Sequence, residues 1–140
     1  MQPADFDETL ENLVKKDSRY ALDAYLFLRD ALDFTQKEIA QDTPEKPRHI
    51  SGQELLEGIR RFGLEQYGPM TFSLFKEWGL TRSSDFGEIV FNMVETGLLG
   101  ASDDDSRKDF SNVYNFYEAF TFPFLPKRKR KGKNQRSTKV

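Results

Sequence analysis

Residues 51–99 contain three apolar helical stretches separated by helix-ending residues, and this pattern constrains the fold more than any other feature of the sequence. Ser51 and Glu54 have the spacing of a capping box, in which each side chain hydrogen-bonds the backbone amide of the other residue at the start of a helix. Gly68 followed by Pro69 ends this helix and begins another, and Gly79 ends the second one. The sequence therefore predicts helices at 51–67, 69–78 and 83–96.

Two further helices are predicted before this block. Apolar residues recur at helical spacing over residues 6–16, with acids early and lysines late, as the helix dipole favours. Residues 19–41 are apolar around much of their circumference, which is typical of a central helix, and they turn polar from Thr35 onward. The two prolines in residues 42–48 then predict a linker.

The aromatic segment at 110–122 fits two structures. Up to Phe116 its large residues alternate imperfectly with smaller ones, and Phe and Tyr favour strands. A period of about 3.6 residues from Val113 to Phe120 fits a helix instead. We favour a β-hairpin, in which a short extended segment from Leu98 is joined by a polar turn to an aromatic strand that ends near Phe116.

The order of helices, short strand, polar turn and aromatic strand is similar to that of a winged helix, whose helix-turn-helix pair would be 69–78 and 83–96. An unrelated small helical bundle with a hairpin fits the same order. The predicted fold class is mainly α with a small β-hairpin: one helical domain resembling a winged helix over residues 1–126, followed by a disordered basic C-terminal tail over residues 127–140.

The charges argue against the usual way in which a winged helix binds DNA. The third helix, which would enter the major groove, carries three acids and Asn92, with Arg82 as the nearby cation. The candidate wing at 103–109 has a net charge of -2. Because phosphate contact requires Lys and Arg, a winged-helix DNA-binding regulator is the alternative function and not the favoured one. Such a regulator would need a positive face built from Arg60, Arg61, Arg82, Arg107 and Lys108.

Charge is divided sharply along the chain. Of the 21 basic residues, eight lie in residues 127–139, where there is no acid, and the other 13 share residues 1–126 with all 23 acids. A basic run of this density binds phosphate backbones without reading bases, with an affinity that falls as salt rises. A solubilising tail that folds back on the acids of the body is the alternative. The candidate nucleic-acid-binding residues are Lys127, Arg128, Lys129, Arg130, Lys131, Lys133, Arg136 and Lys139.

Most kinds of catalytic or metal site lack their residues in this sequence. There is no cysteine, which excludes disulfides, thiolate metal sites and cysteine nucleophiles. The single histidine, His49, lies at a loop–helix junction, where a surface or capping role is the simpler explanation. The aspartates at 103–105 lack the spacing of a calcium loop, so a solvated turn is favoured. We find no nucleophile elbow, phosphate loop or catalytic set, and we predict no enzymatic activity and no cofactor.

The body of the chain also resembles a known family. The residues that carry the resemblance are Phe6-x-x-x-Leu10, Asp17 with Arg19-Tyr20, Tyr25-x-Phe27-Leu28, His49-Ile50-Ser51-Gly52, Gly63-Leu64-x-x-Tyr67-Gly68, Trp78-Gly79, Asp85-Phe86-Gly87-x-Ile89-Val90 and Gly97-Leu98-Leu99. Over about residues 5–120 this pattern resembles an uncharacterised family of small bacterial proteins largely restricted to planctomycetes and verrucomicrobia. The resemblance implies a bacterial cytoplasm and no established activity, and the basic tail lies outside it.

Together these features predict a non-catalytic interaction module. No apolar run approaches the 18 residues or so of a membrane span, and the acidic N-terminus is unlike a signal peptide, so a cytoplasmic protein without membrane contact is expected. The body would contact a protein partner, and the tail would contact RNA, the ribosome or DNA without reading sequence.

Overall fold

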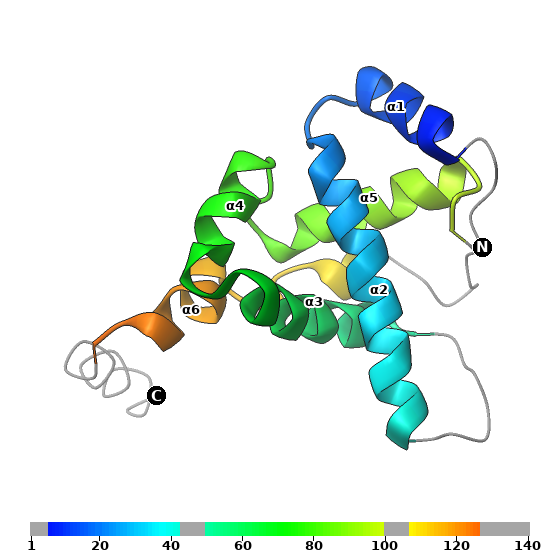
Figure 1. Ribbon diagram of the computed structural model, residues 1–140. Helices are drawn as coiled ribbons and strands as arrows, with labels where there is room; N and C mark the ends of the chain where they lie inside the picture. Colours follow the sequence, from blue (N-terminus) through cyan, green and yellow to red (C-terminus); the bar gives the residue numbers. More distant parts are fainter. Residues whose placement is uncertain (1–5, 43–49, 100–106, 127–140) are drawn as a thin grey trace.

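The computed structural model describes residues 6–42, 50–99 and 107–126. Within these ranges the backbone is helical and contains no strand (Figure 1). The α-helices are α1 (Phe6–Lys16), α2 (Leu22–Asp42), α3 (Gly52–Tyr67), α4 (Thr71–Glu77), α5 (Ser83–Glu95) and α6 (Phe116–Phe120). Three short 3-10 helices accompany them: η1 (Gly68–Met70), η2 (Arg107–Phe110) and η3 (Phe122–Phe124).

The helices predicted before residue 97 are confirmed, and local signals account for their ends. At the start of α3, the Glu54 amide donates to Ser51 Oγ at 3.1 Å and the Ser51 amide donates to Glu54 Oε1 at 3.0 Å, which is the predicted capping box. α4 begins later than predicted because η1 forms its first turn at Pro69. The predicted linker lies outside the described residues except for its first residue, which ends α2.

The predicted β-hairpin is wrong over the part of it that the structure describes, since η2 and α6 occupy the region of the aromatic strand. Asn112 has φ 54, a left-handed conformation that interrupts extended backbone and that Asn adopts more readily than most residues. Asn115 then caps α6 by accepting a hydrogen bond from the Glu118 amide at 3.1 Å. The helical alternative is therefore correct from Phe116 onward, and the described ranges form a helical domain without the strands of a winged helix.

The centre of the core is a group of aromatic rings around Phe75 of α4, which is fully buried. Five rings lie with their centroids 5.0 to 5.9 Å from that of Phe75, and they come from α2, α5, α6 and the end of α4. These rings belong to Phe27, Trp78, Phe86, Phe116 and Phe120. Edge-to-face packing of this kind adds to the burial of apolar surface, so this Phe75 cluster joins four helices in one core.

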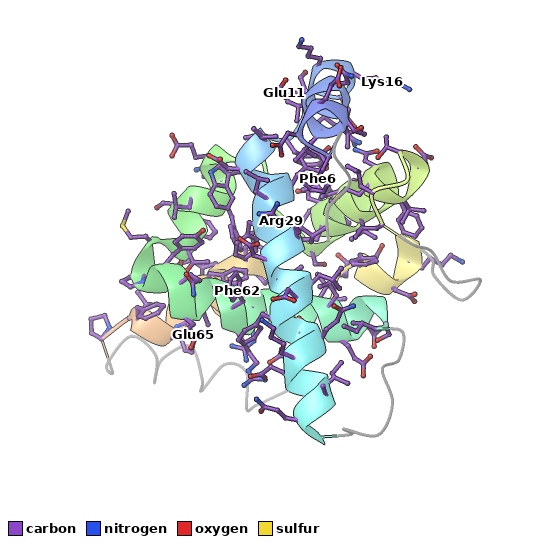
Figure 2. All side chains as sticks on the ribbon, turned by 45° about the vertical axis from the view of Figure 1, so that its right-hand side comes forward. Phe6, Glu11, Lys16, Arg29, Phe62 and Glu65 are labelled. Carbon is purple, nitrogen blue, oxygen red and sulfur yellow. The ribbon has the colours of Figure 1, made fainter. Side chains whose placement is uncertain are left out.

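α2 is central, as its apolar circumference predicts, and Figure 1 shows it crossing the other long helices. On one side, the Arg29 guanidinium lies 5.5 Å from the ring centroid of Phe6 in α1. Phe62 of α3 packs on α2 further along, with its ring 5.5 Å from that of Phe27 and 5.2 Å from that of Phe34. Figure 2 shows Phe6 and Arg29 near the top of α2 and Phe62 on the face that α3 turns toward it.

Glycines allow α3 and α5 to pack closely on their neighbours. A Cβ atom at Gly52 of α3 or at Gly87 of α5 would come within 2.9 Å of side-chain atoms of Phe110. Phe110 is itself buried, so its ring fills a slot between these two helices. A Cβ at Gly58 would overlap the hydroxyl of Thr35, which is buried where α2 meets α3. These contacts fix η2 on the body and set the close spacing of α2 and α3.

Candidate functional site

The residues predicted to bind nucleic acid lie outside the part of the chain that the structure describes. They are Lys127, Arg128, Lys129, Arg130, Lys131, Lys133, Arg136 and Lys139. His49 and the aspartates at 103–105 also lie outside it. The described part of the chain that precedes residue 127 in the sequence consists of α6 and η3.

These two elements expose aromatic side chains, and the basic run follows them in the sequence. Tyr117 of α6 is 41% exposed and Phe124 of η3 is 45% exposed. Backbone hydrogen bonds from the Thr121 amide to the Tyr117 carbonyl and from the Phe124 amide to the Thr121 carbonyl, at 2.9 and 3.0 Å, connect the two residues through successive turns. We call Tyr117 and Phe124 the C-terminal aromatic pair. Figure 1 shows α6 and η3 at the end of the molecule that α4 and η1 also occupy.

The sequence pattern did not distinguish these exposed rings from buried ones. It placed Tyr117 on one helical face with Phe116 and Phe120, but the structure divides these residues. Phe116 and Phe120 are buried in the Phe75 cluster, with their ring centroids 5.1 Å apart, whereas Tyr117 lies on the outer side of α6. The start of α6 at the Asn115 cap decides which side chains face the core and which face outward. The sequence pattern alone does not fix that start.

Several cations of the folded body are held by nearby carboxylates. Arg60 pairs with Glu57 along α3, with an Nη2 to Oε2 distance of 2.6 Å, and Arg61 pairs with Glu38 of α2. Lys37 pairs with Asp33, and Arg29 pairs with Asp30. Arg19 pairs with both Asp17 and Glu88. Arg60 and Arg61 are two of the residues that a DNA-binding positive face would need, and their charges are compensated locally.

α5, the predicted DNA-reading helix, uses its polar side chains within the protein. Asn92 Nδ2 donates to Asp17 Oδ2 at 3.0 Å and to the Tyr25 hydroxyl at 3.1 Å. Glu88 accepts a hydrogen bond from Arg19 at 3.4 Å. On the other side of α5, Phe86, Ile89 and Met93 are fully buried. α5 is therefore a core helix, and two of the side chains that would contact bases, Glu88 and Asn92, are engaged with the turn between α1 and α2.

A polar groove of about 550 Å³ lies beside this network, between α1 and α5. Its lining residues are Thr9, Asn12, Leu13, Lys16, Asp17, Arg19, Asn92, Glu95 and Thr96. The Asp17 carboxylate accepts hydrogen bonds from Arg19 Nε at 2.9 Å, Arg19 Nη2 at 2.7 Å and the Asn92 amide. The Arg19 hydrogen bond is the main reason that the pKa of Asp17 lies well below its usual range. An aspartate held ionised in this way is a structural anchor and a poor proton acceptor.

A second carboxylate, Asp85, organises the start of α5. It accepts hydrogen bonds from the Thr81 amide at 2.9 Å, the Arg82 amide at 3.2 Å and the Tyr20 hydroxyl at 2.8 Å. Burial of the ring, and then the bond to Asp85, raise the pKa of Tyr20. Asp85 thus joins the N-terminus of α5 to the start of α2 and, like Asp17, has a structural role.

Ser83 connects α5 with the segment before α6. It is almost fully buried at the start of α5. Its hydroxyl donates to the Phe110 carbonyl at 2.6 Å and accepts a hydrogen bond from the Val113 amide at 3.1 Å. Tyr114 makes a similar connection by donating to the Leu56 carbonyl at 2.8 Å, and burial raises its pKa. These bonds hold the segment before α6 on the body.

Residues 6–42, 50–99 and 107–126 contain neither a metal-binding cluster nor a membrane-spanning helix. No group of three or more His, Cys, Asp or Glu residues in these ranges is arranged to hold a metal ion. None of the helices there combines the length and apolar character needed to cross a bilayer. The candidate surface is therefore characterised by its exposed rings and by the cations that follow it in the sequence.

Comparison of the chain with protein-family models, with curated proteins and with solved structures finds no match. The resemblance to a family of small planctomycete and verrucomicrobial proteins accordingly stays a prediction.

Proposed function

We propose that the protein is a non-catalytic binding module that contacts the phosphate backbone of nucleic acid through residues 127–139, without reading sequence, and contacts a protein partner through its folded body. The charge distribution carries this proposal, because eight cations and no acid occupy this segment. Ion pairs such as Arg60 with Glu57 and Arg61 with Glu38 support it further. They compensate some cations of the body, whereas the segment after Pro126 contains no acid in its sequence to compensate its eight cations.

The expected affinity is electrostatic. Each phosphate that a Lys or Arg neutralises releases condensed counterions, so the logarithm of the binding constant falls linearly with the logarithm of the salt concentration. For single-stranded nucleic acid the slope is about 0.7 for each phosphate contacted. Because the body carries more acids than bases, it should repel the phosphates that the basic segment attracts, and this repulsion favours contact at the C-terminal end.

We predict that a chain ending at Pro126 binds a labelled RNA oligonucleotide at least about tenfold more weakly than the full chain at the same low salt, because it lacks all eight cations of the segment. Filter binding across a salt series gives both the affinity and the slope. A full-length variant with those eight residues changed to Gln keeps the chain length and should behave like the truncated chain. Equal binding by the truncated and full chains would contradict the proposal.

The protein-partner half of the proposal needs a separate experiment. Both chains, full-length and ending at Pro126, are used to recover proteins from cells, with and without nuclease treatment. A protein that both chains recover after nuclease treatment is a partner of the folded body. Proteins that only the full chain recovers, and that nuclease removes, are bound through nucleic acid. If no protein is recovered by both chains after nuclease treatment, the body has no stable protein partner under those conditions. This half of the proposal then fails.

The winged-helix DNA-binding regulator is not proposed. α5 places Asn92 and Glu88 in hydrogen bonds with the α1–α2 turn, so these side chains are not presented to a DNA groove. A salt-insensitive preference for one duplex sequence over others of the same length would be needed to restore this alternative.

A further inference from the structure

Two aromatic side chains lie on the outer surface of the last described part of the chain, three and ten residues before the basic run begins at Lys127. Tyr117 and Phe124 are 41% and 45% exposed, although most large apolar residues of the protein are buried or half-buried. Resting on the proposed function, we propose that this C-terminal aromatic pair is a base-stacking surface, and that the nucleic acid the protein binds is therefore single-stranded.

The exposure of these rings follows from the packing of α6. Phe116, Ala119 and Phe120 are buried against the core, which fixes the rotation of the helix and turns Tyr117 outward. η3 continues the same run of turns, so Phe124 follows Tyr117 by about two helical turns. Because α6 is held by its buried residues, a base can stack on Tyr117 with little loss of conformational entropy, and Phe124 offers a second ring in the next helical segment.

The distance from these rings to the cations suits a single strand. Lys127 follows Phe124 after Leu125 and Pro126, and four consecutive cations occupy residues 127–130. At about 3.3 to 3.6 Å per extended residue, the chain between Phe124 and Arg130 can span at most about 25 Å. That reach covers the phosphates on either side of a base stacked on the ring. Basic groups that follow the backbone, combined with aromatic rings that stack bases, are the usual elements of single-strand binding.

A duplex cannot use the aromatic pair in this way, because its bases are already stacked on one another and only their edges are accessible in the grooves. The basic run alone would give no preference for single strands, because a duplex has the higher density of phosphate charge. Stacking of one base on an aromatic side chain typically changes affinity by about five- to hundredfold. The aromatic pair should therefore turn non-specific phosphate binding into a preference for unpaired bases.

An anionic membrane is the main competing ligand, since basic residues beside exposed aromatic ones also bind lipid surfaces. Two rings bury much less apolar area than the continuous face of an amphipathic helix that lies in a membrane interface. Glu118, which is exposed and lies between the rings in sequence, is also unfavourable on an anionic bilayer. The observations favour bases over acyl chains, and vesicles are included in the test.

The test compares the full chain with its Tyr117→Ala, Phe124→Ala and double variants. Probes are an oligouridine RNA, the matching single-stranded DNA, a duplex of equal length and vesicles rich in phosphatidylserine. We expect the double variant to bind both single strands at least about tenfold more weakly at one salt concentration, with an unchanged salt slope and less than about twofold change for the duplex. Phe124→Tyr and Tyr117→Phe keep the rings and should bind like the original chain.

Leu22→Ala is the matched control, because Leu22 is also exposed, at 36%, but lies at the start of α2. It should leave all four affinities unchanged. If the double variant loses no affinity for single strands, or loses the same for duplex, the stacking surface is overturned. The inference also fails if the original chain binds vesicles more tightly than RNA and the double variant loses that vesicle binding. The aromatic pair would then be a membrane contact. Failure of the proposed function itself gives a different result, in which the chain ending at Pro126 still binds RNA as tightly as the full chain.

Discussion

The glycines that end α4 and α5 have the same backbone handedness but different surroundings. Gly79 has φ +94 and Gly97 has φ +82, values that favour glycine at both positions. A Cβ at Gly79 would overlap the carbonyl oxygen of Arg19, whereas nothing lies within 4 Å of a Cβ at Gly97. The Ala21 amide also donates to the Trp78 carbonyl at 3.0 Å, so the backbone before α2 is packed directly on the end of α4.

This difference predicts unequal costs for the same substitution. Gly97→Ala should lower the free energy of unfolding by about 1 to 2 kcal/mol, which is the usual cost of a side chain in the left-handed region. Gly79→Ala should cost about 3 kcal/mol or more, because a backbone oxygen has to move as well. Urea unfolding followed by circular dichroism measures both. Equal losses would show that the contact between Arg19 and Gly79 is not tight.

At the scale of elements, the connection between α5 and the segment before α6 depends on Ser83. Its hydroxyl satisfies both the carbonyl of Phe110 and the amide of Val113. Phe110 in turn fills the slot that Gly52 and Gly87 leave between α3 and α5. The position of η2 thus rests on one buried hydroxyl and one buried ring.

We therefore expect Ser83→Ala to lower the free energy of unfolding by about 1 to 3 kcal/mol, since it leaves two backbone groups without their partner. Ser84 is its neighbour and is only half-buried, so Ser84→Ala should change stability by about 0.5 kcal/mol or less. Comparing the urea midpoints of the two variants isolates the role of the hydroxyl. A similar small effect for both would mean that water replaces Ser83 at no cost.

Local signals allowed the first five helices to be predicted but not the segment after residue 107. The capping box at Ser51 and the helix-ending Gly79 act within a few residues, so the sequence alone reveals them. Residues 110–116 fit two periodicities, and long-range packing decides between them, chiefly the slot for Phe110 and the bond from Tyr114 to the Leu56 carbonyl. The C-terminal aromatic pair was missed for the same reason, whereas the basic run was evident from composition.

At the scale of the whole molecule, Asp17 connects the first inter-helix turn with α5, which lies far away in the sequence. Its carboxylate binds Arg19 and Asn92, and Asn92 also binds Tyr25 of α2. Hydrogen bonds to the ionised form lower the pKa of Asp17 in the folded protein below its ordinary value. Folding is therefore favoured more when Asp17 is ionised.

This arrangement predicts a loss of stability in acid. Above about pH 5 Asp17 is ionised in both states, so its contribution is complete and constant. Below about pH 4 the unfolded chain takes up the proton first, and the contribution is lost progressively. Asp17→Asn should be less stable than the original chain at neutral pH, and the difference in free energy of unfolding should shrink toward about pH 2. A difference that stays constant across this range would contradict the assignment.

The position of Trp78 has a practical consequence. It is the one tryptophan of the chain, and its ring centroid lies 5.9 Å from each of those of Phe27, Tyr67 and Phe75. Its intrinsic fluorescence therefore comes from the border of the Phe75 cluster, where excitation of Tyr67 can be transferred to it. Emission spectra report directly on whether α2, α3 and α4 stay assembled, so that opening of the core can be followed optically without attaching a label.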